Sequence, residues 1–217
     1  MKHQITYQDY EWESAGIKEL YQKKKYALED YIDRLLWWNR KVNLISRSVS
    51  RETLQKHVEH SLSLSAIKEV KEASLIVDAG TGGGLPGIPL AIVLDSKKLI
   101  LNDVVEKKLM AVKQIAMQLG LSERVKVVAE SVERLRESDF VLVSKHAFKV
   151  NELYAMVKDQ DWKDMILLKG RDEVEGELKG IKEALKIRIL DLYGARKDGF
   201  YEGKALVIIK RGENEKR

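Results

Sequence analysis

The densest run of glycines in the chain directly follows an apolar segment that is typical of a buried strand. The run spans Asp78 to Gly87 and leads into a predicted helix. Glycines permit a tight turn and let a ligand lie against bare backbone, while the N–H groups at a helix start face a carboxylate or phosphate. Asp103 ends the next predicted strand, where a carboxylate accepts hydrogen bonds from both ribose hydroxyls. This spacing predicts a nucleoside-binding site.

Two classes of ligand compete for such a loop. A dinucleotide site takes the pattern Gly-x-Gly-x-x-Gly, whose third glycine lets the helix pack closely on the strand. Here Leu85 occupies that third position, whereas the leading Asp78-x-Gly80-x-Gly82 is more typical of S-adenosylmethionine enzymes. We therefore prefer the methyl donor as cofactor. An NAD-dependent oxidoreductase and a sharp strand-to-helix turn that binds nothing are the alternatives, and the glycine density and Asp103 argue against the latter.

Short apolar runs alternate with longer amphipathic stretches from Ala73 onward, which is typical of βαβ units around a parallel sheet. The clearest helix spans Val105–Leu119, with one apolar stripe. Residues 194–203 are too few for a crossover helix, so the last two strands are expected to pair antiparallel. Seven strands are predicted: Leu75–Asp78, Lys98–Asp103, Val125–Ala129, Phe140–Ser144, Met165–Lys169, Ile187–Tyr193 and Lys204–Lys210.

The N-terminal third has a helical pattern from Tyr7 to about Val70, with apolar residues three or four positions apart at Leu28, Ile32 and Leu35. A chain of 217 residues is short for two separate cores. We predict one α/β domain over residues 1–217, with a helical extension at about 1–70 and a Rossmann-like core at about 73–211. The predicted fold is that of class I methyltransferases: a seven-stranded, mostly parallel sheet with helices on both faces and an N-terminal helical cap. Residues 212–217 are expected to form a frayed charged tail.

Composition excludes several classes of function. The chain has no cysteine and only four histidines, which argues against disulfides, thiolate nucleophiles and a metal site. No run of about 18 apolar residues occurs, and the polar N-terminus lacks the apolar core of a signal peptide. We therefore expect a cytoplasmic protein without membrane contact, and a monomer. The net charge of +5, from 39 basic and 34 acidic residues, permits a polyanionic partner such as RNA.

The segment from Asp78 to Leu90 reads Asp-Ala-Gly-Thr-Gly-Gly-Gly-Leu-Pro-Gly-Ile-Pro-Leu. It resembles the glycine loop of the RsmG (GidB) family, bacterial methyltransferases that act on N7 of a guanine in 16S ribosomal RNA. Its second half, Leu-Pro-Gly-Ile-Pro-Leu, is far more specific to this family than the general methyltransferase signature is. Other segments along most of the chain are also similar to the family pattern: Trp38–Ile45, His57–Leu62, Asp103–Lys107, Leu119–Leu121, Val132–Glu133 and Lys169–Gly170.

This resemblance implies S-adenosyl-L-methionine as cofactor and 16S ribosomal RNA, or the small ribosomal subunit, as partner. Together with the spacing of the loop, it gives seven candidate cofactor-binding residues: Gly80, Gly82, Leu85, Asp103, Val132, Glu133 and His146. Of these, Asp103 matches the acid that binds the ribose, and Val132 with Glu133 match the pair beside the adenine.

Two positions depart from the family pattern. His146 lies in Lys145-His146-Ala147, where the family has Ser-Arg-Ala, so the contact of the arginine is made by His146, by its neighbour Lys145, or not at all. His60 replaces the acid of the His-x-x-Asp-Ser motif, and no role of that acid is transferred to it. The changed arginine position favours a further alternative, a non-catalytic RNA-binding protein that keeps the fold.

Guanine N7 carries an exposed lone pair and no proton, so its methylation requires no general base. The protein mainly has to align two partners, and good alignment contributes roughly 7 to 11 kcal/mol in well-oriented systems. We therefore name no catalytic residue. Lys145, His146 and Phe148, just after the fourth predicted strand, are candidates for holding the base.

Basic residues that can meet RNA phosphate concentrate in the N-terminal third, although charged runs on amphipathic helices are commonly just solvated faces. These candidates are Lys23–Lys25, Arg40, Lys41, Arg47 and Arg51. Trp37 and Trp38 can stack on bases, but we expect at least one of them to be buried beside Leu35 and Leu36.

Overall fold

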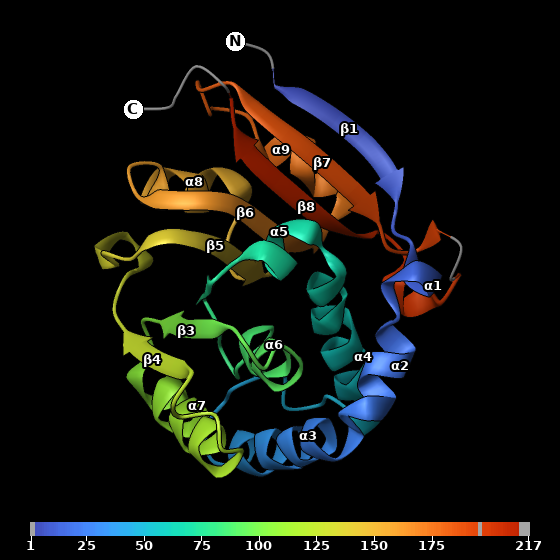
Figure 1. Ribbon diagram of the computed structural model, residues 1–217, viewed down its shortest axis with the longest axis vertical. Coiled ribbons are helices and arrows are strands. Elements are labelled where there is room, and N and C mark those ends of the chain that lie inside the picture. The colour runs from blue at the N-terminus through green and yellow to red at the C-terminus, as the bar shows by residue number, and fades with distance from the viewer. Residues whose placement is uncertain (1–2, 195–196, 213–217) are drawn as a thin grey trace.

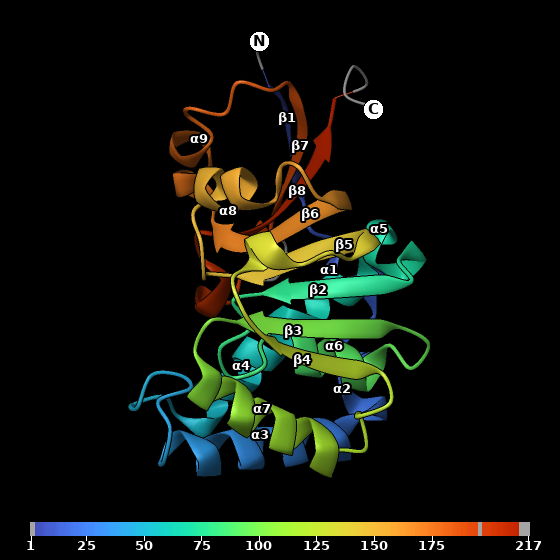
Figure 2. The ribbon, with the colours of Figure 1, turned by 90° about the vertical axis from the view of Figure 1, so that its left-hand side faces the viewer.

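The chain folds around one eight-stranded sheet. A computed structural model describes residues 3–194 and 197–212. The strands are β1 (Gln4–Asp9), β2 (Leu75–Ala79), β3 (Lys98–Asp103), β4 (Val125–Ala129), β5 (Ser138–Lys145), β6 (Asp161–Gly170), β7 (Leu185–Asp191) and β8 (Lys204–Arg211). Their order is β1-β7-β8-β6-β5-β2-β3-β4, and Figure 2 shows β5, β2, β3 and β4 side by side. Only β8 is antiparallel to its neighbours, β6 and β7.

Helices cover both faces of this sheet (Figure 1). They are α1 (Trp12–Ala15), α2 (Ile17–Lys23), α3 (Lys25–Asn39), α4 (Arg51–Leu62), α5 (Lys68–Glu72), α6 (Gly87–Val93), α7 (Glu106–Gln118), α8 (Val150–Val157) and α9 (Val174–Glu177). Successive strand residues point to opposite faces. Ile76 and Val141 therefore belong to the apolar cluster shared with α2 to α7, whereas Val77 and Leu142 belong to the cluster under α8 and α9.

The α/β class and the mostly parallel sheet are confirmed, but the count of seven strands is wrong. All seven predicted strands are present with small changes at their ends, and β7 and β8 pair antiparallel as expected. The eighth strand is β1, so residues 7–9 are extended and not helical. It runs parallel to β7, with Gln4 opposite Lys186 and Asp9 opposite Asp191. Every side chain of β1 except that of Ile5 is exposed, so this edge strand is held by backbone pairing. Its sequence therefore lacks the alternation of apolar and polar residues that would predict a strand.

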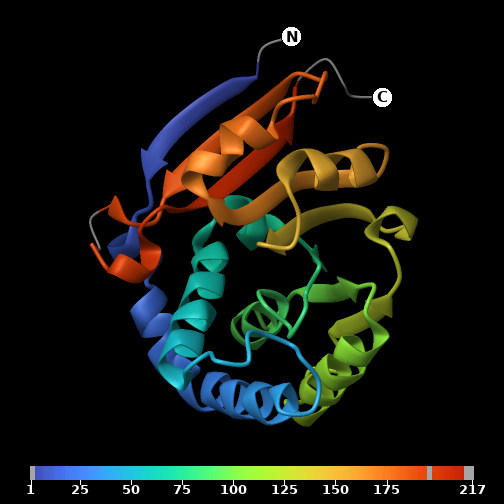
Figure 3. The same ribbon diagram turned by 180° about the vertical axis from the view of Figure 1, so that it is seen from behind.

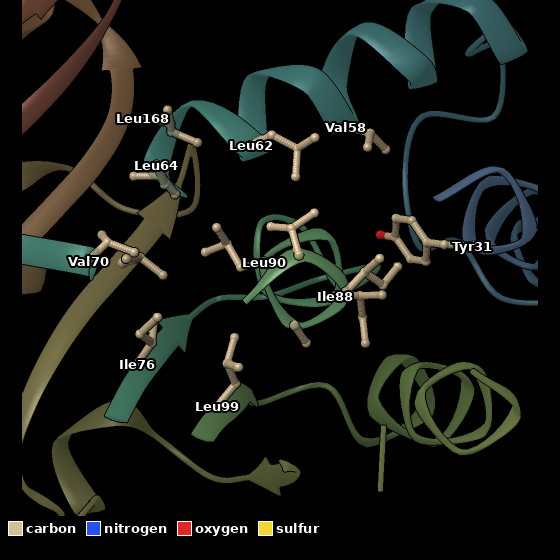
Figure 4. Packing of buried hydrophobic residues seen from close by; sticks show 14 of the residues in the cluster. Tyr31, Val58, Leu62, Leu64, Val70, Ile76, Ile88, Leu90, Leu99 and Leu168 are labelled. Carbon is tan, nitrogen blue, oxygen red and sulfur yellow. The ribbon is translucent and has the colours of Figure 1, made fainter. Parts of the chain in front are cut away.

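The N-terminal helices share their apolar core with the sheet. Figure 4 shows Tyr31 of α3 and Leu62 of α4 near Ile88 and Leu90 of α6, with Ile76 of β2 at the lower left. The predicted helix at 105–119 is confirmed as α7, whose stripe is buried. The single domain over residues 1–217, with its division near residues 70–73, stays a prediction. The predicted tail at 212–217 lies outside the described residues apart from Gly212.

Candidate functional site

The carboxyl ends of β2, β3, β4 and β5 meet at one edge of the sheet because these strands are parallel. Ligands of open α/β sheets bind at this edge. The seven residues predicted to bind the cofactor lie at these ends or in the segments that follow them: Gly80, Gly82, Leu85, Asp103, Val132, Glu133 and His146.

The glycine loop turns sharply between β2 and α6. Gly80, Gly82 and Gly84 have φ values of 72°, 55° and 95°, in the left-handed region that glycine adopts at little cost. At Gly80 the absence of a side chain is also a packing requirement, because a Cβ there would lie 2.4 Å from the Cβ of Ala147. The segment after β5 therefore packs directly on the loop, and His146 is held next to it.

Asp103 braces the same loop. Its Oδ2 accepts a hydrogen bond from the Gly82 N–H at 3.0 Å, and its Oδ1 accepts one from the Val105 N–H at 3.0 Å. The structure thus brings together the glycine and the acid that the spacing selected. Asp103 is only half-buried, so the carboxylate remains open to a ligand.

Asn102, which sequence analysis missed, links three loops of the site. Its carbonyl oxygen accepts hydrogen bonds from the N–H groups of Gly80 and Thr81, both at 2.9 Å. Its side-chain amide donates to the carbonyl oxygen of Glu130 at 2.8 Å, in the segment that leads to Val132. A buried amide between Leu101 and Asp103, in an otherwise apolar strand, was the available signal, since buried polar groups need partners.

Asp78 is a buried acid beneath the loop. Its Oδ2 accepts hydrogen bonds from Thr81 Oγ1 at 2.6 Å and from the Gly87 N–H at 2.8 Å, whereas its Oδ1 has no partner in the described residues. Burial raises the pKa of Asp78 to about 7, against the lowering effect of those hydrogen bonds and of Lys145. A Cβ on Gly87 would lie 2.1 Å from Leu101, so Gly87 takes over the close helix packing that Leu85 does not provide.

The N-terminal helices hold the loop from the other side. The hydroxyl of Tyr31 in α3 donates to the carbonyl oxygen of Gly83 at 3.0 Å, within the core. At the end of α3, Asn39 Oδ1 accepts hydrogen bonds from the N–H groups of Leu44 and Ile45, at 2.9 and 3.0 Å. This shapes the connection between α3 and α4, which crosses in front of α6 in Figure 3. No sequence signal separated Tyr31 from an ordinary core residue.

The remaining predicted positions surround the loop. Leu85 is half-buried and its N–H donates to the Thr81 carbonyl oxygen at 3.0 Å. Val132 is buried in a short 3-10 helix, Val132–Arg134, and its carbonyl oxygen accepts a hydrogen bond from Gln160 at 2.7 Å. The side chain of Glu133 is exposed. An apolar wall with an exposed acid beside it therefore follows β4.

His146 and Lys145 point in different directions. His146 is exposed and has a φ of 52°, which is uncommon for a side-chain-bearing residue and is enriched at functional sites. The ammonium of Lys145 is turned inward, where it donates to the His57 carbonyl oxygen at 3.0 Å. Burial lowers the pKa of Lys145 to about 7. Although His146 as a whole residue is exposed, desolvation of its imidazole ring, followed by the charge of Lys145, lowers its pKa to about 4. Of the two candidates for the arginine position, His146 is the one exposed beside the loop.

Within residues 3–194 and 197–212, no group of three or more histidines and acids is placed to hold a metal ion. Nor does the described part of the chain contain a helix that is both long and apolar enough to span a bilayer.

The residues at this edge fit S-adenosylmethionine. Gly82 combines a left-handed φ with open space, since its nearest neighbour to a Cβ would be the Leu44 carbonyl oxygen at 3.7 Å. Asp103 offers a carboxylate to a ribose, and the buried Oδ1 of Asp78 leaves one acceptor unsatisfied near the loop.

Several solved methyltransferases share this architecture. A methyltransferase from Geobacter sulfurreducens superposes with a TM-score of 0.58 at 16% identity, over 83% of this chain and 89% of that one. An O-methyltransferase from Bacillus cereus, in complex with SAH, superposes with a TM-score of 0.55 at 14% identity, over 90% and 100% of the two chains. These likenesses establish the fold. Fold and site together define a Rossmann-like, S-adenosylmethionine-dependent methyltransferase.

Residues 24–191 match the family described as rRNA small subunit methyltransferase G, or GidB, and the chain belongs to this family. The Ribosomal RNA small subunit methyltransferase G of Flavobacterium psychrophilum is 34% identical over 180 residues, which cover 79% of this chain and 84% of the relative. The protein of the same name from Chlorobaculum tepidum is 41% identical over 119 residues, which cover 54% of each chain. The resemblance inferred from the glycine loop is thereby confirmed, and the NAD-dependent alternative is not favoured.

Proposed function

We propose that this protein transfers a methyl group from S-adenosylmethionine to N7 of a guanine in 16S ribosomal RNA. The hydrogen bond between the Gly82 N–H and the Asp103 carboxylate carries the proposal. It joins the glycine loop to the acid at the end of the next strand, and a nucleoside cofactor requires both. Family membership supplies the class of substrate, since the relatives are named for ribosomal RNA of the small subunit.

Seven residues hold the cofactor in this proposal: Gly80, Gly82, Leu85, Asp103, Val132, Glu133 and His146. The bare backbone of the glycine loop receives the amino acid part, and the Asp103 carboxylate receives the ribose hydroxyls. Val132 and Glu133 border the adenine. His146 lies where the cofactor and the RNA base meet, because Ala147 beside it packs on Gly80.

When bound, S-adenosylmethionine supplies a methyl group on a positively charged sulfur. Guanine N7 has no proton to remove, so no side chain of this protein has to act as a base. The side chains align the guanine and exclude water. Because positive charge develops on the purine, a neutral neighbour is preferable to a cation. The low pKa of His146, about 4, keeps its imidazole neutral at pH 7.

The connection between α3 and α4 supports the RNA surface in this proposal. It carries Arg40, Lys41 and Arg47, which are exposed and form no ion pair within the described residues. The same connection lies over Gly82, so these cations are close to the mouth of the site. Free cations near the site are suited to RNA phosphates. Arg51 differs, because Asp33 and Glu29 already pair with it.

Trp37 offers an aromatic surface on the same side. It is 48% exposed, and the ammonium of Lys41 lies 3.7 Å from the centre of its ring. Trp38 is partly buried and packs on the core, in agreement with the expectation that at least one of the two is a core residue. An exposed tryptophan with a cation beside it suits a nucleotide base.

A methyl transfer assay tests the proposal. Small ribosomal subunits and naked 16S RNA from cells that lack this protein are incubated with it and tritiated S-adenosylmethionine, and methylated guanines are mapped by mass spectrometry. One N7-methylguanine is expected with the wild type and with Asp95→Asn, a matched exposed acid elsewhere, and much less with Asp103→Asn. No incorporation into either RNA substrate would contradict the proposal. Stabilisation by NADH instead of S-adenosylhomocysteine in a melting experiment would favour the oxidoreductase.

A further inference from the structure

Five basic side chains from three distant segments meet beside the glycine loop. We call them the basic cluster: His57 and His60 of α4, Lys145 and His146 at the end of β5, and Lys204 at the start of β8. Lys145 Nζ lies 3.2 Å from His57 Nδ1, although the two residues are 88 positions apart. The rings of His60 and His146 have centroids 6.1 Å apart.

Phe200 connects Lys204 to the rest of the cluster. Its ring lies edge-to-face on His57, with centroids 5.1 Å apart, and Lys204 Nζ lies 4.3 Å from its ring centre. On the other side, Ala147 packs where a Cβ of Gly80 would be. The basic cluster is therefore continuous with the cofactor loop.

In the described part of the chain no acid forms an ion pair within the basic cluster, although Asp198 and Asp78 attract Lys204 and Lys145 from a distance. No carboxylate of the described residues forms an ion pair with Lys145 or Lys204. The nearby acids are otherwise engaged: Asp198 pairs with Lys56 at 3.5 Å, and Glu177 pairs with Lys169 at 2.7 Å. Asp78 acts on Lys145 through its field, without an ion pair.

His60 supplies a second, independent observation. Its side chain is fully buried, and neither ring nitrogen has a hydrogen-bond partner in the described residues. A neutral imidazole always carries one N–H, so a buried donor is left unsatisfied beside His146. This unsatisfied N–H adds to the polar groups without a partner in the basic cluster.

The pKa values agree with this picture. Burial, followed by the charge of Lys145, lowers the pKa of His57 to about 4 and that of His60 well below its usual range. Burial also lowers the pKa of Lys204. A negative charge among these groups would relieve their mutual repulsion and raise each pKa.

We propose that the basic cluster is an oxyanion-binding site. His146 and Lys204, at its open side, contact the anion, Lys145 supplies charge from beneath, and His60 positions His146. The inference rests on the proposed function, which offers two oxyanions at this place: the carboxylate of the methyl donor, or a phosphate of the RNA beside the target guanine.

Histidine NMR tests the site directly, because the chain has only four histidines and His3 lies outside the cluster. The imidazole pKa values are measured in sodium sulfate and in sodium chloride of equal ionic strength. We expect sulfate to raise the pKa of His57 and His146 toward the usual value and to leave His3 unchanged. Equal values in the two salts would overturn the proposal.

Matched variants link the response to the cluster. Lys145→Met should abolish the effect of sulfate on His57 and His146. Lys163→Met should preserve it, because Lys163 lies at the opposite edge of the sheet and pairs with Asp139. If Lys145→Met fails to fold, His146→Gln should abolish the response of His57. A full sulfate response in the folded cluster variant would overturn the proposal.

Two ligands distinguish the sources of the oxyanion. S-adenosylhomocysteine carries the carboxylate, whereas 5′-methylthioadenosine has the same nucleoside without the amino acid part. If the carboxylate occupies the cluster, only the former raises the histidine pKa values, and Lys145→Met weakens its binding at least tenfold without affecting methylthioadenosine. If an RNA phosphate occupies the cluster, a guanine-containing oligoribonucleotide raises the histidine pKa values in the presence of methylthioadenosine. A response to none of these ligands overturns the site, whereas failure of both adenosine ligands to bind the wild type overturns the proposed function.

Discussion

The replacement Asp103→Asn separates bracing of the glycine loop from binding of the ribose. In the wild type, the two carboxylate oxygens accept separate hydrogen bonds from the N–H groups of Gly82 and Val105, both at 3.0 Å. An asparagine has only one acceptor oxygen, so one of these N–H groups meets the amide NH₂ instead. Hydrogen bonds to a charged group contribute about 1.5 to 3 kcal/mol. We expect the free energy of unfolding to fall by about 1 to 2 kcal/mol, since Asp103 is half-buried.

The same substitution should weaken cofactor binding further. Loss of a charge-assisted bond from the ribose hydroxyls corresponds to about 1.5 to 3 kcal/mol, or about a 10- to 150-fold higher Kd for S-adenosylhomocysteine. Calorimetry with S-adenosylhomocysteine and its 2′-deoxy analogue isolates the ribose contact. The wild type should discriminate between the two ligands, and Asp103→Asn should discriminate much less. Asp95→Asn, an exposed acid paired with Lys24, is the control.

An unchanged ratio of the two affinities in Asp103→Asn would refute the ribose contact. If stability also fell as predicted, Asp103 would be only a brace for the loop. Normal stability together with normal affinity would refute both roles.

Three further substitutions test the loop. Gly80→Ala places a Cβ 2.4 Å from that of Ala147, so it should weaken S-adenosylhomocysteine binding at least tenfold and lower the free energy of unfolding by about 2 kcal/mol or more. Gly120→Ala, with φ 69° but open space, should show only the backbone cost of roughly 1 kcal/mol. Equal effects of the two substitutions in calorimetry and urea unfolding would contradict the packing argument. Tyr31→Phe leaves the buried Gly83 carbonyl without its donor and should lower stability by about 1 to 2 kcal/mol, whereas the exposed Tyr26→Phe should stay within about 0.5 kcal/mol in the same measurement. Burial raises the pKa of Asp78 from 3.8 to about 7, so the folded state keeps a proton that the unfolded chain releases. This contribution to stability is full below pH 3.8 and is lost as the pH rises to about 7, by about 1.4 kcal/mol per pH unit. Asp78→Asn should remove that slope from urea unfolding at pH 4 to 7, and an unchanged slope would show that Asp78 is ionised throughout.

The sequence permitted prediction of the features that depend on local pattern. Buried parallel strands are short apolar runs, and β3 and β4 were found to the residue. Gly82 and Asp103 were paired because the ends of adjacent parallel strands must meet. By contrast, β1 could not be predicted, since it is an exposed edge strand that the backbone of β7 holds in place.

The basic cluster was beyond prediction for a different reason. His57, Lys145 and Lys204 are brought together only by the order of β5, β6 and β8 in the sheet and by the packing of α4. In the sequence, His57 and His60 belong to a segment that resembles the family pattern, and Lys145 is a candidate for holding the RNA base. Long-range topology turned these separate observations into one site, while burial decided that Lys145 points inward and His146 outward.

The apolar stripe of helix α3 includes one residue that contacts the glycine loop. Leu28, Ile32 and Leu35 repeat with helical spacing and are fully or almost fully buried, as the pattern predicts. Tyr31 lies in the same stripe and differs from its neighbours only by a hydroxyl, which donates to the Gly83 carbonyl oxygen. This hydrogen bond and the Leu35 side chain, which lies beside Gly83, both connect α3 to the glycine loop. The packing of the N-terminal helices and the shape of the glycine loop are therefore coupled, and a substitution in α3 can alter the loop that is proposed to bind the cofactor.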